Sequence, residues 1–289
     1  MDPEFRAGLA ALVGRTNAGK STLLNALVGR KISIVTPKPQ TTRHPVQGIV
    51  HRPGGQVVLV DTPGFFKTRS SRLVDELHGR ARSALEGIDV VVHVVDPSRE
   101  PGEEELMVLE ALQGILPPRV LCLNKADLRR RPALAAWQAR ATSYAAVVEA
   151  SGRTGLGLEL LVAELLRILP VHPPLYPVDQ VTNAHRDFEI AELIREQVYL
   201  QTGEEIPYRT TIELDSVEPA VTRDGRPYLH IKAAILTHHD RHQRMLIGVG
   251  AGRIRSIGIG ARRALEERLG QQVFLDLDVL VEKEGTRGL

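Results

Sequence analysis

The stretch Gly14-Arg15-Thr16-Asn17-Ala18-Gly19-Lys20-Ser21-Thr22 decides the fold. It fits the pattern G-x-x-x-x-G-K-[ST] and lies between an apolar run and a segment of helical period, which is the context that a phosphate-binding loop requires. Gly14 and Gly19 let backbone amides turn inward toward a phosphate, and the following helix adds its positive dipole end. Lys20 supplies a cation for phosphate oxygens, and the Ser21 hydroxyl is a ligand for Mg²⁺. A glycine-rich strand-to-helix turn that binds nothing is the alternative interpretation.

On both sides of this loop, up to about residue 169, short β-branched apolar runs alternate with longer segments of helical period. That alternation predicts an α/β domain with a mostly parallel sheet and helices on both faces. A hairpin turn at Pro53-Gly54-Gly55 makes the predicted sheet mixed. We expect strands at residues 9–13, 46–51, 57–60, 90–95, 120–123 and 146–149. We expect helices at residues 19–29, 73–85, 103–112, 133–143 and 158–168.

Closely spaced prolines mark the end of this domain. Pro170, Pro173, Pro174 and Pro177 leave no room for a continuing helix or strand, and they suit an extended linker. The predicted division is a first domain at residues 1–171, a linker at 172–182 and a second domain at 183–289. The second domain has the predicted order α-β-β-α-α-β, an α+β fold. Its elements are expected at residues 187–201, 208–217, 228–237, 241–247, 253–269 and 274–281.

Asp61-Thr62-Pro63-Gly64-Phe65 follows the predicted strand at residues 57–60. The Asp61 carboxylate therefore emerges at the carboxyl edge of the sheet, where α/β proteins place their ligands and where it can hold Mg²⁺ through water. Gly64 can bring its amide near a γ-phosphate. An Asp-Thr-Pro-Gly tetrapeptide is otherwise often a plain turn, so its place after this strand is what favours nucleotide binding.

Asn124-Lys125-Ala126-Asp127 ends the apolar run at residues 120–123 and predicts which base is bound. A carboxylate at Asp127 accepts hydrogen bonds from guanine N1–H and the 2-amino group, whereas adenine offers no such pair of donors. GTP is therefore favoured over ATP. Ser151-Gly152-Arg153 follows the strand at 146–149, and a backbone amide there is expected to bind guanine O6. The alternative interpretation of residues 124–127 is a helix-capping loop.

A polar loop, Gln40-Thr41-Thr42-Arg43-His44, lies between the first helix and the next strand. A GTP-dependent switch needs a threonine there to complete Mg²⁺ coordination and to sense the γ-phosphate, and we prefer Thr42 over Thr41. The alternative is a solvated loop with neighbouring threonines. The predicted Mg²⁺ ligands are thus Ser21, Thr42 and Asp61, and the predicted catalytic residues are Lys20, Thr42 and Gly64.

Phe65 stands where Ras-like GTPases carry the glutamine that orients the attacking water. An apolar side chain has no group for that task. We therefore predict a GTPase that turns GTP into GDP and phosphate slowly on its own and is accelerated by an ion or a partner.

The composition of the whole chain sets limits on its partners and location. Lysine and arginine number 37 against 35 acids, a net charge of +2, so a surface for nucleic acid must be local. The single cysteine, Cys122, excludes an intrachain disulfide and fits a reducing cytoplasm. No apolar stretch approaches the ~20 residues that span a bilayer. We expect a cytoplasmic protein. Peripheral contact with the cytoplasmic face of the inner membrane is left open, although nothing in the sequence argues for it.

The order of these motifs resembles the Era family of GTPases over nearly the whole chain. This resemblance implies a GTPase domain followed by a KH domain, with GTP or GDP and Mg²⁺ as cofactors. It implies binding to the 3′ end of 16S rRNA and a role in assembly of the 30S ribosomal subunit, with no DNA partner. Asn17 is the residue type that helps to hold K⁺ in several relatives, so K⁺ stimulation is a further hypothesis. The matching stretches are residues 17–21, 39–44, 61–65, 124–127, 176–182, 194–196 and 205–208.

A basic strip supports RNA binding. Residues 241–265 contain six arginines and no acid, around a glycine-rich turn. In KH domains a G-x-x-G turn between two helices clamps about four nucleotides. Here that turn reads Gly248-Val249-Gly250-Ala251, with alanine for the second glycine and valine for the usual basic residue. A solvated helix–helix corner is the alternative. The candidate RNA contacts are this turn and Arg241, Arg244, Arg253, Arg255, Arg262 and Arg263.

Two other functions are compatible with parts of the sequence. A P-loop metabolic kinase or ATPase would share the phosphate loop, but the group at residues 124–127 argues against it. A GTPase switch that acts on a protein partner or in tRNA modification would have lost RNA binding in its C-terminal domain. Val249 and Ala251 keep that second alternative open.

Overall fold

The computed structural model describes residues 4–38, 41–43, 45–64, 87–113, 116–203 and 205–282. The chain divides into two compact units, one made of residues 1–35 and 39–184 and the other of residues 36–38 and 185–289. The assignment of residues 172–182 as a linker between two domains stays a prediction. Among the described residues, no helix combines the length and the apolarity that crossing a membrane requires.

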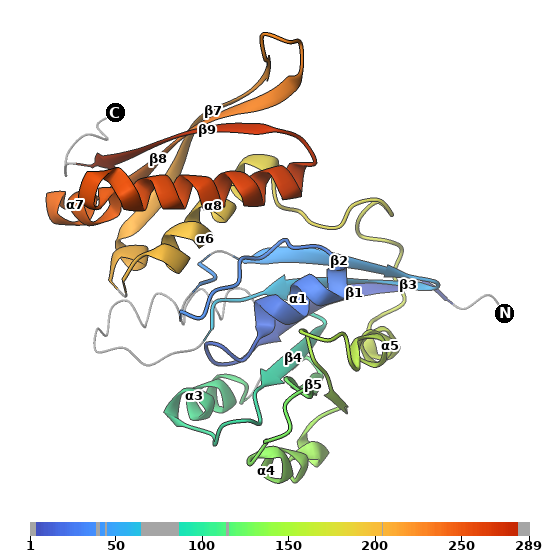
Figure 1. Ribbon diagram of the computed structural model, residues 1–289. Coiled ribbons are helices and arrows are strands. Elements are labelled where there is room, and N and C mark those ends of the chain that lie inside the picture. Colours follow the sequence, from blue (N-terminus) through green and yellow to red (C-terminus); the bar gives the residue numbers. More distant parts are fainter. Residues whose placement is uncertain are drawn as a thin grey trace, which may run out of the picture. The chain divides into compact units, whose positions relative to one another are not determined.

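The first unit is built on a six-stranded sheet with the order β2-β3-β1-β4-β5-β6 (Figure 1). β2 and β3 form an antiparallel hairpin, and all other neighbours in this sheet run parallel. The predicted mixed, mostly parallel sheet is confirmed. β4 is buried along its whole length because helices cover both faces. The strands are β1 Arg6–Val13, β2 Val46–Arg52, β3 Gly55–Asp61, β4 Val90–Val95, β5 Arg119–Leu123 and β6 Ala146–Glu149.

Helices flank this sheet on two sides. α1 (Lys20–Val28) and α5 (Leu158–Ile168) contact each other and β3. On the other face, α3 (Glu103–Ala111) packs Val108 against Val91, and α4 (Leu134–Gln138) packs Trp137 against Val95. Val91 and Val95 point to the same side of β4, since side chains alternate along a strand. The sheet is thus enclosed, and its carboxyl edge is left to the loops.

The helix predicted at residues 133–143 is wrong as a single element. α4 ends at Gln138, and a separate 3₁₀ turn at Ala141–Ser143 follows. Thr142 and Ser143 are weak helix formers whose hydroxyls compete for backbone hydrogen bonds, which explains why the helix does not continue. The helix predicted at residues 73–85 lies outside the described residues.

The proline-rich segment after α5 is extended and lies along the β2–β3 hairpin. The amides of Leu175 and Tyr176 donate to Oε1 of Gln56 at 2.8 and 3.0 Å. Further along, the amide of Ile49 in β2 donates to the carbonyl of Val181 at 2.9 Å. Because β2 is an edge strand, this segment satisfies backbone groups that would otherwise be open to pairing with another chain.

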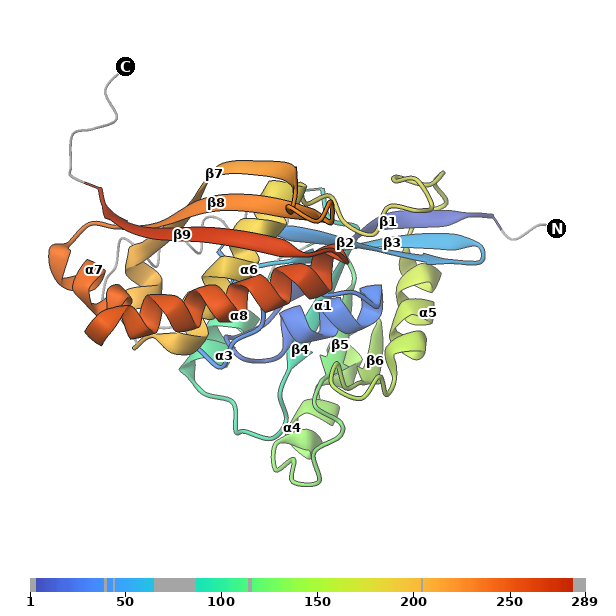
Figure 2. The same cartoon turned by 45° about the horizontal axis from the view of Figure 1, so that its top comes forward.

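The second unit has the predicted order of elements, which is confirmed. Its sheet has the order β7-β8-β9, with β7 and β8 antiparallel and β8 and β9 parallel. α6 and α8 lie side by side against one face of this sheet (Figure 2). Ile194 of α6, Ile231 of β8 and Leu265 of α8 are fully buried in this core. The elements are α6 Arg186–Gln201, β7 Thr210–Val221, β8 Pro227–Thr237, α7 Asp240–Ile247, α8 Gly252–Leu269 and β9 Val273–Val281.

β7 differs from its predicted extent of 208–217 at both ends. A 3₁₀ turn at Ile206–Arg209 occupies the predicted start, with Pro207 in its first residues, where proline is favoured. The strand then continues through Pro219 to Val221. A proline is tolerated there because β7 is an edge strand, whose outer side needs no ladder hydrogen bonds.

Candidate functional site

The loops that carry the predicted nucleotide-binding residues follow β1, β3, β5 and β6. Since these strands are parallel, their carboxyl ends meet at one edge of the sheet, the edge at which α/β proteins bind ligands. The phosphate loop also presses closely on β4. A Cβ on Gly14 would lie 2.3 Å from the carbonyl oxygen of Val94. Only glycine fits at that position.

Asp61 is the centre of the phosphate end of the site and is fully buried. Its Oδ2 accepts hydrogen bonds from the hydroxyls of Ser21 at 2.6 Å, Ser33 at 2.9 Å and Thr42 at 3.2 Å. The Ser21 and Thr42 hydroxyl oxygens are 3.1 Å apart. The structure therefore brings together the three residues predicted to hold Mg²⁺, and adds Ser33 to them.

This cluster fits a divalent cation. Burial raises the pKa of Asp61, against the opposing effects of the Lys20 charge and the three hydroxyls, because a carboxylate without water is poorly solvated. The second oxygen, Oδ1, is buried and has no hydrogen-bond partner among the described residues. Carboxylate and hydroxyl oxygens are the ligands that Mg²⁺ prefers. Ser21, Thr42 and Asp61 therefore form a donor set that suits this ion.

Lys20 is held inside the phosphate loop. Its Nζ donates to the carbonyl oxygens of Gly14 and Arg15, both at 3.0 Å. Burial lowers the pKa of Lys20 to about 8, although the negative charge of Asp61 opposes the shift. Gly64 comes close to it, since a Cβ at that position would lie 2.9 Å from Nζ. Lys20 and Gly64, two of the predicted catalytic residues, are thus neighbours.

Asn124 links the base end of the site to the phosphate loop. Its Nδ2 donates to the carbonyl of Ala18 at 2.8 Å, and its Oδ1 accepts a hydrogen bond from the amide of Gly152 at 3.3 Å. Asn124 is only 2% exposed. One buried amide therefore ties three loops of the site together.

Gly152 lies too close to α1 to carry a side chain. A Cβ on Gly152 would lie 2.8 Å from the backbone nitrogen of Leu23 in α1. That distance is too short for a side chain. The glycine is thus needed for the close approach of this loop to α1.

The other residues of the guanine group are oriented by side chains. Oδ1 of the half-buried Asp127 accepts a hydrogen bond from the hydroxyl of Ser151 at 2.6 Å. Ser151 itself is fully buried and accepts hydrogen bonds from the amides of Arg153 and Thr154, both at 3.2 Å. Ala126 is fixed through its amide, which donates to the carbonyl of Ala150 at 3.0 Å. The Asp127 carboxylate is therefore held in place and stays accessible.

Asp96 was not predicted, yet it joins both ends of the site. Lys125 donates to its Oδ2 at 2.6 Å, and Arg15 of the phosphate loop reaches the same oxygen at 3.3 Å. Burial works against ionisation here, but hydrogen bonds from Lys125 and Ser98 prevail and lower the pKa of Asp96. Asp96 directly follows the buried strand β4, and Asp61 ends the buried strand β3, so the same rule would have found Asp96.

Ser33 was also missed. Its amide donates to Asn25 Oδ1 at 2.9 Å, and Asn25 Nδ2 donates back to its carbonyl at 2.7 Å. Asn25, near the end of α1, thereby fixes the direction in which Ser33 points toward Asp61. No sequence signal marks this serine, because its role depends on a loop conformation that the local residues do not specify.

The remaining predicted nucleotide-binding residues are placed as follows. The Thr16 hydroxyl donates to Glu104 at 3.1 Å, and the Thr62 hydroxyl donates to the carbonyl of Leu12 at 2.7 Å. Asn17 has a left-handed backbone with a φ of 59°. Pro63 is buried, Thr22 is half-buried and Arg153 is exposed. Phe65 and residues 39, 40 and 44 lie outside the described residues.

The predicted RNA-binding turn connects α7 to α8. Gly248, Gly250 and Ala251 have positive φ values of 72°, 56° and 58°. For a residue with a Cβ this conformation costs about 1–2 kcal/mol, so Ala251 is strained where a glycine would not be. Val249 is 100% exposed. The turn keeps an open backbone but lacks a cation at its tip.

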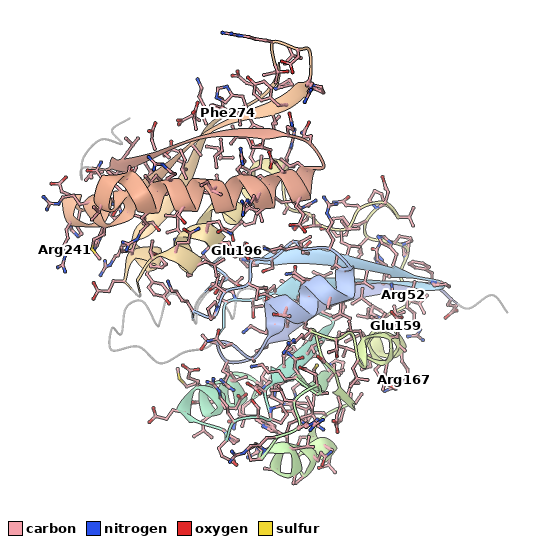
Figure 3. The ribbon with its side chains drawn as sticks, viewed as in Figure 1. Arg52, Glu159, Arg167, Glu196, Arg241 and Phe274 are labelled. Atoms are coloured by element: carbon pink, nitrogen blue, oxygen red, sulfur yellow. The ribbon has the colours of Figure 1, made fainter. Side chains whose placement is uncertain are left out.

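The six predicted arginine contacts are all exposed. Arg253 braces the turn, because its Nη1 donates to the carbonyl of Met245 at 2.5 Å. Arg241 lies in the first turn of α7, at the end of that helix away from Gly248 (Figure 3). Arg262 is in a different place: it lines a cleft with residues of β8, β9 and the hairpin between β7 and β8. The strip is therefore not one compact patch.

Sequence comparisons agree with both units. Residues 9–125 match the family model described as 50S ribosome-binding GTPase, and residues 205–285 match the KH domain. GTPase Era of Geobacter metallireducens is 38% identical over 287 residues, which cover 98% of this chain and 95% of the relative. GTPase Era of Stenotrophomonas maltophilia is 40% identical over 280 residues, covering 96% and 92%.

Solved structures match over the same extent. A crystal structure of Era in complex with MgGDPNP and nucleotides 1506–1542 of 16S ribosomal RNA has a TM-score of 0.88 and 30% identity, covering 97% of this chain and 95% of that one. A variant of Aquifex aeolicus Era bound to GDP·AlF₄⁻ has a TM-score of 0.87 and 30% identity with the same coverage.

Ser33→Ala should raise the Mg²⁺ concentration needed for half-maximal GTP hydrolysis about tenfold, since groups that orient a ligating carboxylate contribute on that scale. The measurement is a Mg²⁺ titration of the initial rate. Ser33→Thr keeps the hydroxyl and should restore most of the wild-type requirement. An unchanged Mg²⁺ requirement in Ser33→Ala would contradict a positioning role for this residue.

Proposed function

This chain belongs to the Era family of GTPases, and from that premise we propose that it is a GTP-controlled switch that binds the 3′ end of 16S rRNA during assembly of the 30S ribosomal subunit. As a member of this family it is an enzyme that hydrolyses GTP to GDP and phosphate. The observation that supports the proposed RNA binding is the α7–α8 turn of the KH domain. Exposed arginines surround this turn, and residues 241–265 contain no acid. The related Era solved with 16S rRNA nucleotides supports the same assignment.

In the proposed site, guanine is read by the loops at residues 124–127 and 151–153. Asp127 accepts hydrogen bonds from the base, and Ser151 keeps its carboxylate in position. A backbone amide of the loop at residues 151–153, which Asn124 holds through the amide of Gly152, is expected to donate to guanine O6. Presenting adenine would leave the Asp127 carboxylate without its donors, which costs several kcal/mol and favours GTP strongly.

The phosphates are bound by the loop at residues 14–22. Lys20, held in that loop by two carbonyl oxygens, is the cation that turns to the β- and γ-phosphate oxygens. Ser21, Thr42 and Asp61 would hold Mg²⁺, which when bound neutralises negative charge on those oxygens. Gly64 lies against Lys20 and offers its amide to the γ-phosphate. Thr42 is both a proposed Mg²⁺ ligand and a proposed catalytic residue. It thereby couples the loop around residue 42 to the nucleotide state.

Hydrolysis is proposed to be slow without an activator. Residue 65 is phenylalanine, so this position supplies no group that orients water. Asn17 lies in the phosphate loop and carries a side-chain carbonyl that can ligate a monovalent cation. A K⁺ ion there would add positive charge near the leaving phosphate, the kind of electrostatic stabilisation that dominates phosphoryl transfer.

In the proposed cycle, GTP favours the RNA-bound state and hydrolysis releases the partner, so that turnover acts as a timer. The 30S subunit is then the partner, and the cytoplasm is the location. No described feature supports the peripheral contact with the inner membrane that the sequence left open, so that contact stays a prediction.

The RNA half is tested by fluorescence anisotropy of the full chain with a labelled RNA of nucleotides 1506–1542 of 16S rRNA. We expect a lower Kd with GDPNP than with GDP, and a Kd that rises steeply with salt because arginines replace counterions on the phosphates. Absence of RNA binding in both nucleotide states, with guanine-nucleotide binding intact, would contradict the proposal. That result would favour a switch that acts on a protein partner or in tRNA modification.

K⁺ dependence is tested by comparing GTP hydrolysis in KCl and NaCl at equal ionic strength. We expect turnover to be at least about tenfold faster in K⁺, given the size of such electrostatic effects. Asn17→Ala should remove most of the difference between the two salts. Equal turnover of the wild-type chain in Na⁺ and K⁺ would rule the K⁺ site out.

A further inference from the structure

We propose that a cleft at the hairpin end of the KH domain binds one further nucleobase of the RNA strand, beyond the nucleotides held at the α7–α8 turn. The inference rests on the proposed RNA binding and adds a site to it. The cleft has a volume of about 470 Å³, which lies within the ~300–1,000 Å³ of ligand sites. It forms where the β7–β8 hairpin, the second half of α8 and the start of β9 meet. Its lining includes Arg223, Tyr228, Arg262, Gln272 and Phe274.

Aromatic rings give this cleft a stacking surface. Phe274 is 53% exposed, although phenylalanine is usually buried. Its ring makes edge contacts with the ring of Tyr228, at a centroid distance of 6.5 Å, and with that of His230, at 5.2 Å. These contacts brace a ring that is half open to solvent. Stacking on such rings is how proteins hold the unpaired bases of single-stranded RNA.

Two arginines supply positive charge next to these rings. The guanidinium groups of Arg223 and Arg262 make no hydrogen bond or ion pair with any residue that the structure describes. The lining also holds one acid, Glu266, which accepts a hydrogen bond from the amide of Val273 at 3.2 Å. Two arginines against this one acid leave the lining with a net positive charge. Two available guanidinium groups beside aromatic rings suit a nucleotide, with phosphate on the arginines and base on the ring. Gln272 adds an amide that can pair with a base edge.

α8 provides the path from the turn to the cleft. Arg255 and Arg262 are seven residues apart, which places them on one face of the helix about 10 Å from each other along its axis. Ile259 lies between them on the same face and is 43% exposed. Figure 3 shows Arg241 of α7 and Phe274 well apart within this domain. A strand clamped at the turn must therefore follow α8 for about three helical turns, from Gly252 to Arg262, to reach the cleft.

The neighbouring sheet surface restricts this path. β7 and β9 expose acids next to the cleft, and one of them, Asp276, pairs with His230 at 2.8 Å. Phe274 shares its face of β9 with Asp276, because side chains alternate along a strand. A phosphate backbone is repelled by such an acidic surface, so we expect only the base to reach the Phe274 ring while the phosphates stay beside Arg223 and Arg262. The exposed acids are Glu213, Asp215, Glu218, Asp276 and Asp278.

The test compares Kd values of full-chain variants for the labelled RNA of nucleotides 1506–1542, across a salt series with GDPNP present. Phe274→Ala should weaken binding about tenfold, the scale of one lost base–aromatic stack, with the salt slope unchanged. Phe274→Trp keeps a stacking ring and should bind like the wild type. Arg262→Gln should weaken binding and make the salt slope shallower by about 0.7, as expected for one lost phosphate contact on a single strand.

Leu280→Ala is the matched control, because Leu280 lies on β9, is 50% exposed and is outside the cleft lining. It should bind RNA as the wild type does. If Phe274→Ala binds as tightly as the wild type while Arg253→Gln binds more weakly, the cleft proposal is overturned and the proposed function stands. If the wild-type chain does not bind this RNA at all, both fail.

Discussion

The burial of one carboxylate, Asp61, is the constraint on which the nucleotide site depends. A fully buried acid is costly unless its charge is compensated. Here one oxygen is surrounded by three hydroxyls and the other has no partner among the described residues. The Lys20 charge only partly offsets the effect of burial on its pKa. A divalent cation would compensate the Asp61 charge, and the phosphate loop that supplies Ser21 would bring the nucleotide to the same point.

The proposed sites for GTP and for RNA differ in how far their polar side chains are buried. The nucleotide loops are joined by buried polar side chains, Asn124 and Asp96, so that base recognition and phosphate binding belong to one hydrogen-bonded unit. The proposed RNA surface is exposed, and its arginines lie on both α7 and α8. Buried networks give selectivity, because a wrong ligand leaves polar groups unpaired. Exposed arginines give an affinity that depends on salt.

The strands and the order of elements were predictable because buried β-branched runs have no other stable place than an enclosed sheet. Polar residues directly after those runs were predictable for the same topological reason, and Asp96 obeys that rule although it was passed over. Ser33 and the need for glycine at position 152 were not predictable, since both follow from a close approach of segments distant in sequence. The break after Gln138 reflects local propensities that a periodic pattern hides. Arg262 was predicted as an RNA contact together with the turn residues. The sequence alone did not show that its side chain lines a separate cleft.

The claim that Asp61 is held for a divalent cation is tested most directly by electron paramagnetic resonance with Mn²⁺ in place of Mg²⁺. The full chain with GDPNP should bind one Mn²⁺ tightly, and Asp61→Asn, which keeps the volume but removes the charge, should lose that tightly bound ion. Circular dichroism of Asp61→Asn shows whether the variant is folded. A folded Asp61→Asn that retains tightly bound Mn²⁺ at the wild-type level would contradict the account.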